Sequence, residues 1–258
     1  MPTPLEVLLD PLSLGLLTLY AIIIVLEALF PARKLPAVKG WYLRSAGVFI
    51  VYFYLSTYLP MIWDQYLIPY QLIDLSHINH YVGTFVALVL FELFVYVWHR
   101  TMHQTKWLWL TFHQMHHSAE RLDTFGTFYY SPLDMAGFTF LGSLTLALGV
   151  GLSAEAITLF LYVSMFLVLF QHANIKTPRW IGYLIQRPES HSVHHQKGVH
   201  AYNYSDFPIF DILFGTFKNP KEFNDDIGFY DGASARIGEM LIAKDVYKPE
   251  AKNASELA

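Results

Sequence analysis

The sequence contains no cysteine among its 258 residues. This absence excludes disulfides, thiolate-ligated haem, cysteine-bound iron–sulfur clusters and zinc fingers. Charged residues are scarce as well, at 15% against about a quarter in an ordinary soluble domain. The net charge is only −4, and the basic residues are scattered, so the composition does not indicate nucleic-acid binding. Apolar residues make up 54% of the chain, which indicates a membrane protein.

Five apolar runs are long enough to cross, or nearly cross, a hydrocarbon core of about 30 Å. They cover residues 12–30, 45–63, 81–98, 132–149 and 154–171. We therefore predict an all-α, polytopic membrane protein with four or five transmembrane helices.

The distribution of Lys and Arg predicts how these helices are oriented. The loop 31–44 carries four cations, whereas 64–80 carries two acids and no base. Positive charges near helix ends are retained in the cytoplasm, so the first loop is expected to be cytoplasmic. Counting the crossings places 99–131, and everything after His172, on the same cytoplasmic side.

Nine of the twelve histidines have the spacing of metal ligands or end an apolar run. A pair four residues apart shares one face of a helix, and a His-x-x-His-His string presents rings over an arc of about 100°. One such pair closes the third run, two such strings follow, and one histidine ends the fifth run. The predicted metal ligands are His99, His103, His113, His116, His117, His172, His191, His194 and His195.

Nine imidazoles are too many for one metal ion, because a structural zinc takes four ligands and a catalytic zinc three. Two ions sharing them would receive four or five each. Imidazole alone does not select the metal, since zinc, copper, iron and nickel all accept it. His200 is either a further ligand or a hydrogen-bond partner of one. His77 and His80 begin the third run, and we expect them to bind nothing at the site.

Taken with their flanking residues, these motifs resemble the fatty acid hydroxylase and sterol desaturase superfamily of membrane histidine-box di-iron oxygenases. The resemblance spans roughly 81–217. It is carried by His99-Arg-Thr-Met-His103, Phe112-His113-Gln-Met-His116-His117-Ser118, His191-Ser-Val-His194-His195, Asn203-Tyr204 and Asp211-Ile-Leu-Phe-Gly-Thr216.

The resemblance implies two iron ions, O2 as co-substrate, and hydroxylation or desaturation of a lipid such as a sterol, fatty acyl chain or ether lipid. Electrons would come from a separate protein of the reductase, ferredoxin or cytochrome b5 type. Some relatives carry a second histidine four residues after the one that ends the fifth helix. Here Lys176 stands at that position, so one iron is expected to have fewer nitrogen ligands.

Four acidic residues are candidates to orient the ligating rings through their second nitrogen, as carboxylates commonly do at metal sites. No catalytic residue is predicted beyond the metal ligands. Rival interpretations are a histidine-rich metal transporter and a di-zinc hydrolase. The four acids are Glu92, Asp123, Glu189 and Asp211.

We divide the chain into N-terminal membrane helices at 1–80, a catalytic domain with a histidine-rich metal-binding cap on the cytoplasmic face at 81–217, and a cytoplasmic tail at 218–258. The last residues, 256–258, match no retrieval signal. This favours a bacterial inner membrane over the endoplasmic reticulum. The oligomeric state stays open.

Overall fold

Five helical segments of the computed structural model are long and apolar enough to cross a membrane. The structure describes residues 1–248. Residues 249–258, which include the terminal signal position discussed above, lie outside the described residues. The predicted all-α architecture with four or five transmembrane helices is confirmed, with five candidate spans. They are α2 (Pro11–Leu29), α3 (Trp41–Leu67) with the 3₁₀ turn η1 (Ile68–Tyr70), α4 (His80–Gln104), α7 (Pro132–Ser143) with the π-helical turn η4 (Leu144–Gly149), and α8 (Ala154–His172).

Shorter elements connect these spans or follow them. Before the spans lies α1 (Pro4–Leu9), and two short strands, β1 (Ile73–Asp74) and β2 (Val150–Gly151), pair in parallel. The remaining elements are α5 (Lys106–Leu108), η2 (Trp109–His113), α6 (Gln114–His117), η3 (Thr124–Gly126), η5 (Arg179–Tyr183), α9 (Pro188–His194), α10 (Pro208–Leu213), η6 (Ala233–Ala235) and α11 (Ile237–Leu241).

Local sequence signals explain where the later spans begin. Ser131 precedes α7 and accepts a hydrogen bond from the backbone N–H of Asp134, while Pro132 fills the first helical position. Ser153 caps α8 in the same way through the backbone N–H of Ala156. Such side-chain caps satisfy backbone donors that a helix start leaves unpaired. Both starts agree with the sequence prediction.

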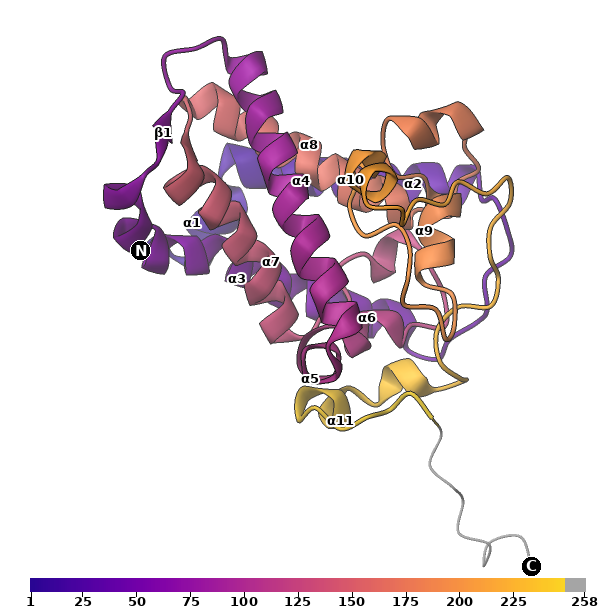
Figure 1. Ribbon diagram of the computed structural model, residues 1–258. Helices are drawn as coiled ribbons and strands as arrows, with labels where there is room; N and C mark the ends of the chain where they lie inside the picture. Colours follow the sequence, from indigo (N-terminus) through magenta and orange to yellow (C-terminus); the bar gives the residue numbers. More distant parts are fainter. Residues whose placement is uncertain (249–258) are drawn as a thin grey trace, which may run out of the picture.

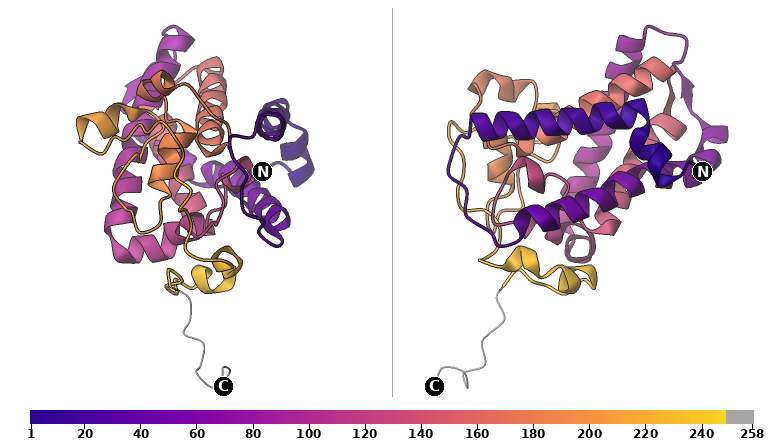
Figure 2. Two further views of the ribbon diagram at one scale, coloured as in Figure 1. Left: turned by 90° about the vertical axis from the view of Figure 1, so that its right-hand side faces the viewer. Right: turned by 180° about the vertical axis from the view of Figure 1, so that it is seen from behind.

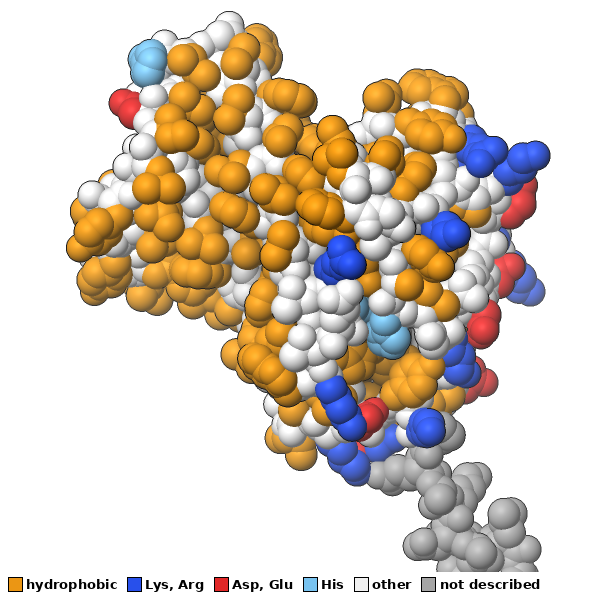
Figure 3. All heavy atoms as spheres, in the orientation of Figure 1, with side chains coloured by type: hydrophobic (Ala, Val, Ile, Leu, Met, Phe, Trp, Pro, Cys, Tyr) orange, Lys and Arg blue, Asp and Glu red, His pale blue; other side chains and the backbone are white. Residues whose placement is uncertain are grey.

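The central span is α4, which has the largest buried share of the five. It packs against α8, with Ala87, Leu88 and Phe160 in the shared core. In contrast, α2 and α3 bury little of their apolar surface. They lie on the same face of the molecule, in front in the right-hand view of Figure 2, with α2 packed against α8 and α3 against α7. In Figure 3, apolar side chains cover much of the surface of the spans, at the upper left. Charged side chains gather on the right and lower right of the same view. This division suits a protein whose spans face lipid.

The segment after α8 folds over one end of the bundle (Figure 1). Arg33, in the loop between α2 and α3, donates to Asn174 and Asp225 of this segment. The cation-bearing first loop therefore lies at the same end of the molecule as the carboxyl end of α8. The β1–β2 pair, which includes Asp74, joins the loops at the other end of the spans. The loop 31–44 and the segment after His172, which we predict to share one side of the membrane, therefore lie at the same end of the molecule.

Residues 229–246 belong to the segment that we describe from sequence as a tail, and they supply part of a core. Phe229, Ala233, Met240 and Val246 are buried with Trp41, Trp109 and Met115. The segment thus lies against the region of α5 and α6 (Figure 1). One glycine is required for this packing, because Gly228 has φ +74° and a Cβ there would lie 2.6 Å from the carbonyl oxygen of Ala119.

We predict that Gly228→Ala lowers the free energy of unfolding by about 1–3 kcal/mol, because a left-handed backbone and a steric clash are imposed together. Gly238→Ala is the matched control, since nothing lies within 4 Å of a Cβ at this position in α11. Thermal unfolding of both variants in detergent measures the effect. Equal melting temperatures for the two variants would contradict this account of the packing.

Candidate metal centre

The nine histidines predicted as ligands come from four separate stretches of chain and are all buried. The last turns of α4 and α8 provide three of them, and the turn formed by η2 and α6 provides three more. The rest come from α9 and the residue that ends it. Because η2 is π-helical, its wider turn changes the direction of the side chains that follow, and such turns are frequent at functional sites.

The structure gathers these histidines into two adjacent groups. Within each group the candidate ligand atoms lie within 4.8 Å of one another. Each His-x-x-His-His string is divided between the groups, so α6 and α9 both serve two centres. The rings of His117 and His195, one from each group, stack with centroids 4.2 Å apart. The first group is His99, His103, His113, His117 and His194, and the second is His116, His172, His191 and His195.

Four rings have their outer nitrogen, Nδ1, fixed by an oxygen atom. A carbonyl oxygen, or a carboxylate oxygen in its ionised form, only accepts hydrogen bonds. With Asp134 ionised, each Nδ1 therefore carries the ring proton, and Nε2 is left with a bare lone pair. Holding one ring nitrogen in this way is the usual means of orienting a ligand histidine. The bonds run from His99 to the Tyr204 carbonyl at 2.7 Å, His113 to Asp134 Oδ2 at 2.7 Å, His172 to the Val168 carbonyl at 2.7 Å, and His194 to the Tyr202 carbonyl at 2.8 Å.

The bare nitrogens point at one another. His99 Nε2 lies 2.9 Å from His113 Nε2, although the proton of each ring is engaged on the other side. Neither nitrogen has a hydrogen to donate, so two lone pairs meet in a buried space. The Nε2 atoms of His103, His117 and His194 are buried with no partner. Unpaired buried polar atoms are costly, and a cation between them would satisfy the whole set. The donor atoms present therefore fit metal ions.

Burial also keeps the rings in the form that binds metal. Among the ligand candidates outside the membrane spans, burial lowers the pKa of every ring, and neighbouring histidines lower it further. A neutral imidazole is the form that offers a lone pair to a metal. These rings are His113, His116, His117, His191, His194 and His195.

The acid that holds a ring is Asp134 in the first turn of α7, which is not among the four acids predicted from sequence. It is fully buried, and its Oδ2 accepts the Nδ1–H of His113. Its place three residues after the capping serine was the available signal. Nothing in the spacing of the sequence connects it with a histidine that lies twenty-one residues earlier.

The four acids proposed from sequence accept hydrogen bonds from other groups, and no bond from them to a histidine is seen within the described part of the chain. Glu92 accepts the backbone N–H of Asp206. Asp211 accepts the N–H of Tyr204 and so supports the carbonyl that holds His99. The other two acids stabilise loops: Asp123 accepts from Trp41 Nε1 and Arg121, and Glu189 from Thr177.

His200 lies outside both groups, with its Nδ1 3.0 Å from Nδ1 of His103. It is thus an outer partner of a candidate ligand, one of the two roles left open by sequence. His80 begins α4 and His77 lies in the loop just before it, so both are at the far end of that helix from His99. Lys176 pairs with Glu222 on the surface, and the second group has four histidines where the first has five.

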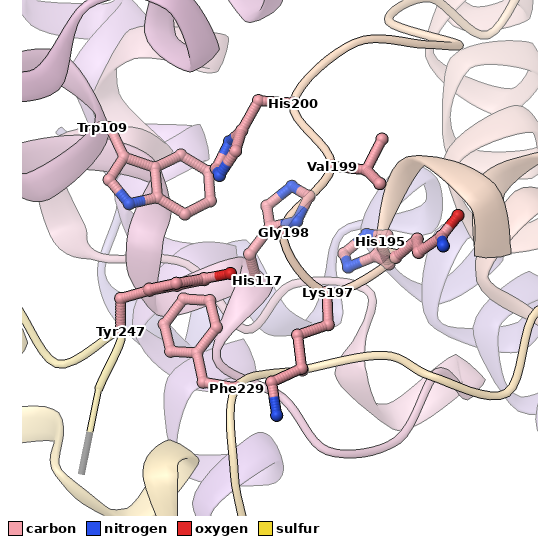
Figure 4. Close-up of a pocket in the computed structure, with 11 residues that line it drawn as sticks. Trp109, His117, His195, Lys197, Gly198, Val199, His200, Phe229 and Tyr247 are labelled. Carbon is pink, nitrogen blue, oxygen red and sulfur yellow. The ribbon is translucent and has the colours of Figure 1, made fainter.

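A small cavity of about 10 Å³ reaches both groups from the polar side (Figure 4). His117 and His195 lie at it, together with the rings of Trp109, His200 and Phe229. The aromatic residues between 125 and 130, which follow α6, contact different parts of the molecule. Tyr130 lies 4.5 Å from His116, ring centroid to centroid. Phe125, Phe128 and Tyr129 pack instead against rings of α2 or α3.

Fold and site together define a polytopic membrane protein with a buried cluster of histidines that could hold two metal ions. A family model described as fatty acid hydroxylase matches residues 84–216, just over half of the chain. The chain belongs to the fatty acid hydroxylase family. This confirms the resemblance drawn from the histidine motifs.

Curated relatives agree with this assignment. Cholesterol 25-hydroxylase of Rattus norvegicus is 25% identical over 166 residues, which cover 59% of this chain and 51% of the relative. A cholesterol 25-hydroxylase-like protein of Danio rerio is 31% identical, covering 50% and 53%. Sphinganine C4-monooxygenase 1 of Arabidopsis thaliana is 25% identical, covering 51% and 52%. The chain spans about half the length of these relatives. No solved structure matches it significantly.

We predict that Asp134→Ala weakens metal binding by about 10–100-fold, the usual cost of losing a partner that orients a ligand. Asp134→Asn should weaken it less, because its amide oxygen still accepts the Nδ1–H of His113. Titration with Co²⁺ in competition with a chelator measures this. Asp74→Ala, at the exposed β1 strand, is the control, and an affinity of Asp134→Ala equal to that of the control would refute the role.

Proposed function

We propose that this protein is a membrane-bound di-iron oxygenase that hydroxylates or desaturates a lipid. O2 is the co-substrate, and electrons arrive from a separate reductase, ferredoxin or cytochrome b5 type of protein. The observation that carries the proposal is the pair of adjacent, buried groups of five and four histidines, with bare nitrogens such as those of His99 and His113 facing each other. The predicted ligand set is the nine histidines of these groups.

The choice of iron rests on the family and on its members' names. Imidazole donors accept several metals, but the relatives are named as hydroxylases and a monooxygenase. Bound iron would supply O2 activation toward an unactivated C–H bond. The chain's own residues hold neutral ligands, keep the site buried and fix the rings through Asp134 and backbone carbonyls.

The substrate is expected to approach from the membrane side of the centre. Tyr130, just before α7, and Phe138, within α7, lie against the histidine rings there. The ring centroid of Phe138 is 5.9 Å from that of His99 and 6.1 Å from that of His113. An apolar aromatic wall suits a hydrocarbon chain and excludes water. The cavity beside His117 and His195 opens on the polar side and is separate from this wall.

Two rival functions fit the arrangement less well. A metal transporter places its ligands near the bilayer midplane on interrupted helices, whereas here the ligands end α4 and α8. A di-zinc hydrolase usually includes carboxylate ligands. Both groups found among the described residues consist of histidine alone.

We further propose that the metal centre faces the cytoplasm, on the side of the membrane that carries the cation-bearing loop 31–44. A bacterial inner membrane is the location we favour, with the endoplasmic reticulum as the alternative. The catalytic domain in this proposal is 81–217.

Comparative lipid mass spectrometry of cells with and without the gene tests the function. We expect a lipid that gains one oxygen or loses two hydrogens only when the gene is present. Expression of His113→Ala should reduce this product by more than about 100-fold, beyond the loss seen for an outer partner. His77→Ala, an exposed histidine at the other end of α4, should leave it unchanged. A product that survives His113→Ala would contradict the proposal.

A further inference from the structure

A chain of polar side chains leads from His191 away from the histidine cluster. Nδ1 of His191 lies 3.4 Å from the Gln186 amide nitrogen, which lies 2.5 Å from the Gln171 amide oxygen. The Gln171 amide nitrogen lies 2.7 Å from Oδ1 of Asp206. Both glutamines are almost fully buried. The chain thus connects a candidate ligand of the four-histidine group with a carboxyl group that touches no histidine within the described residues.

Each amide has one donor end and one acceptor end. The hydrogen bonds that join Gln186, Gln171 and Asp206 must therefore all be donated in the same direction, either toward Asp206 or away from it. In the first direction, Gln171 donates to the Asp206 carboxylate, Gln186 donates to Gln171, and Gln186 also donates to Nδ1 of His191. The proton of His191 then lies on Nε2. This Nε2 is 3.0 Å from the bare Nε2 of His172, to which it donates. In this state His191 cannot bind a metal through Nε2.

The second direction has both amides turned over, which costs little space because the oxygen and NH₂ ends are similar in size. His191 now donates its Nδ1–H to Gln186, and Gln171 donates to the same oxygen. The oxygen of Gln171 then faces Asp206 at 2.7 Å, and this contact requires a proton on Asp206. Turning over Gln186 alone would place two carbonyl oxygens 2.5 Å apart. The two amides must therefore turn together.

We infer that Asp206 is a positioning residue that takes up a proton when a metal ion binds to His191, with Gln171 and Gln186 transmitting the change. The proton balance is simple. The proton of His191 moves from Nε2 to Nδ1, so its number on the ring is unchanged, and one proton from solvent is added to Asp206. The inference rests on the proposed metal centre and names a residue that adjusts it.

The surroundings of Asp206 suit this role. Burial raises the pKa of Asp206 to about 7, against the hydrogen bond from Gln171. Both protonation states are therefore accessible near neutral pH. Glu92 of α4 accepts the backbone N–H of Asp206 and has its other oxygen buried without a partner. Burial raises the pKa of the Tyr130 hydroxyl, and the charge of Asp206 raises it further. The carboxyl group of Asp211 is a further acid near Glu92.

Calorimetric titration with Co²⁺ tests the inference on the full-length protein. At pH 8, in two buffers of different ionisation enthalpy, the experiment counts the protons exchanged per bound ion. We expect Asp206→Asn to release about one proton more than the wild-type protein, because it takes none up. Its amide can donate to Gln171, so binding itself should persist. Asp226→Asn, at an exposed position, should match the wild type.

Equal proton counts for the wild type and Asp206→Asn would overturn the inference while leaving the metal centre in place. A wild-type protein that binds no Co²⁺ would overturn the proposed function and the inference with it. The two failures are therefore distinguishable.

Variants of Gln186 give a second test. Gln186→Glu places an acceptor-only group beside His191 and fixes the second direction, so Co²⁺ should bind roughly tenfold more tightly. Gln186→Met removes the acceptor and should weaken binding by about 10–100-fold. If the amide served only to fill space, these two substitutions of similar size would leave the affinity for Co²⁺ nearly equal. Equal affinities, or a weaker affinity for Gln186→Glu, would contradict the inference.

Discussion

The structure depends on one electrostatic constraint, which is that buried imidazole nitrogens with bare lone pairs face one another. His99 and His113 show it most clearly, because each has its proton held by an oxygen on the outer side while their Nε2 atoms lie 2.9 Å apart. Water is excluded by burial, and protonation is opposed by it. A metal cation is the species that satisfies such a site without adding another donor or acceptor. The donor atoms of the cluster therefore fit metal ions, as the two histidine groups that could hold them indicate.

The fold serves this constraint by bringing outer partners from several elements to the end of the bundle. Asp134 enters from the first turn of α7, and the loop after α9 contributes the carbonyls of Tyr202 and Tyr204. Asp211 holds that loop in place. The segment 229–246 covers the polar side, whereas Tyr130 and Phe138 cover the membrane side. The centre thus lies between this cover and an apolar aromatic wall, which is the arrangement that the proposed lipid oxygenase requires.

Much of this could be predicted from sequence, because hydropathy marks membrane spans and helical spacing places His99 and His103 on one face. The division of each histidine string between two groups could not be predicted, since His116 and His117 are neighbours in sequence and separate only through tertiary packing. The same reason hid Asp134, whose sequence position indicates a helix cap and whose contact with His113 depends on how α7 meets α6. Proximity in sequence to a histidine string does not identify the acids that orient the ligand rings. Asp123 and Glu189 lie near such strings in sequence, but they accept hydrogen bonds from loop residues instead.

The most direct measurement is anomalous X-ray scattering at the iron edge from crystals of protein produced with sufficient iron. We predict two peaks per chain, one surrounded by His99, His103, His113, His117 and His194, and the other by His116, His172, His191 and His195. A single peak, a peak away from these rings, or zinc in place of iron in the active protein would contradict it.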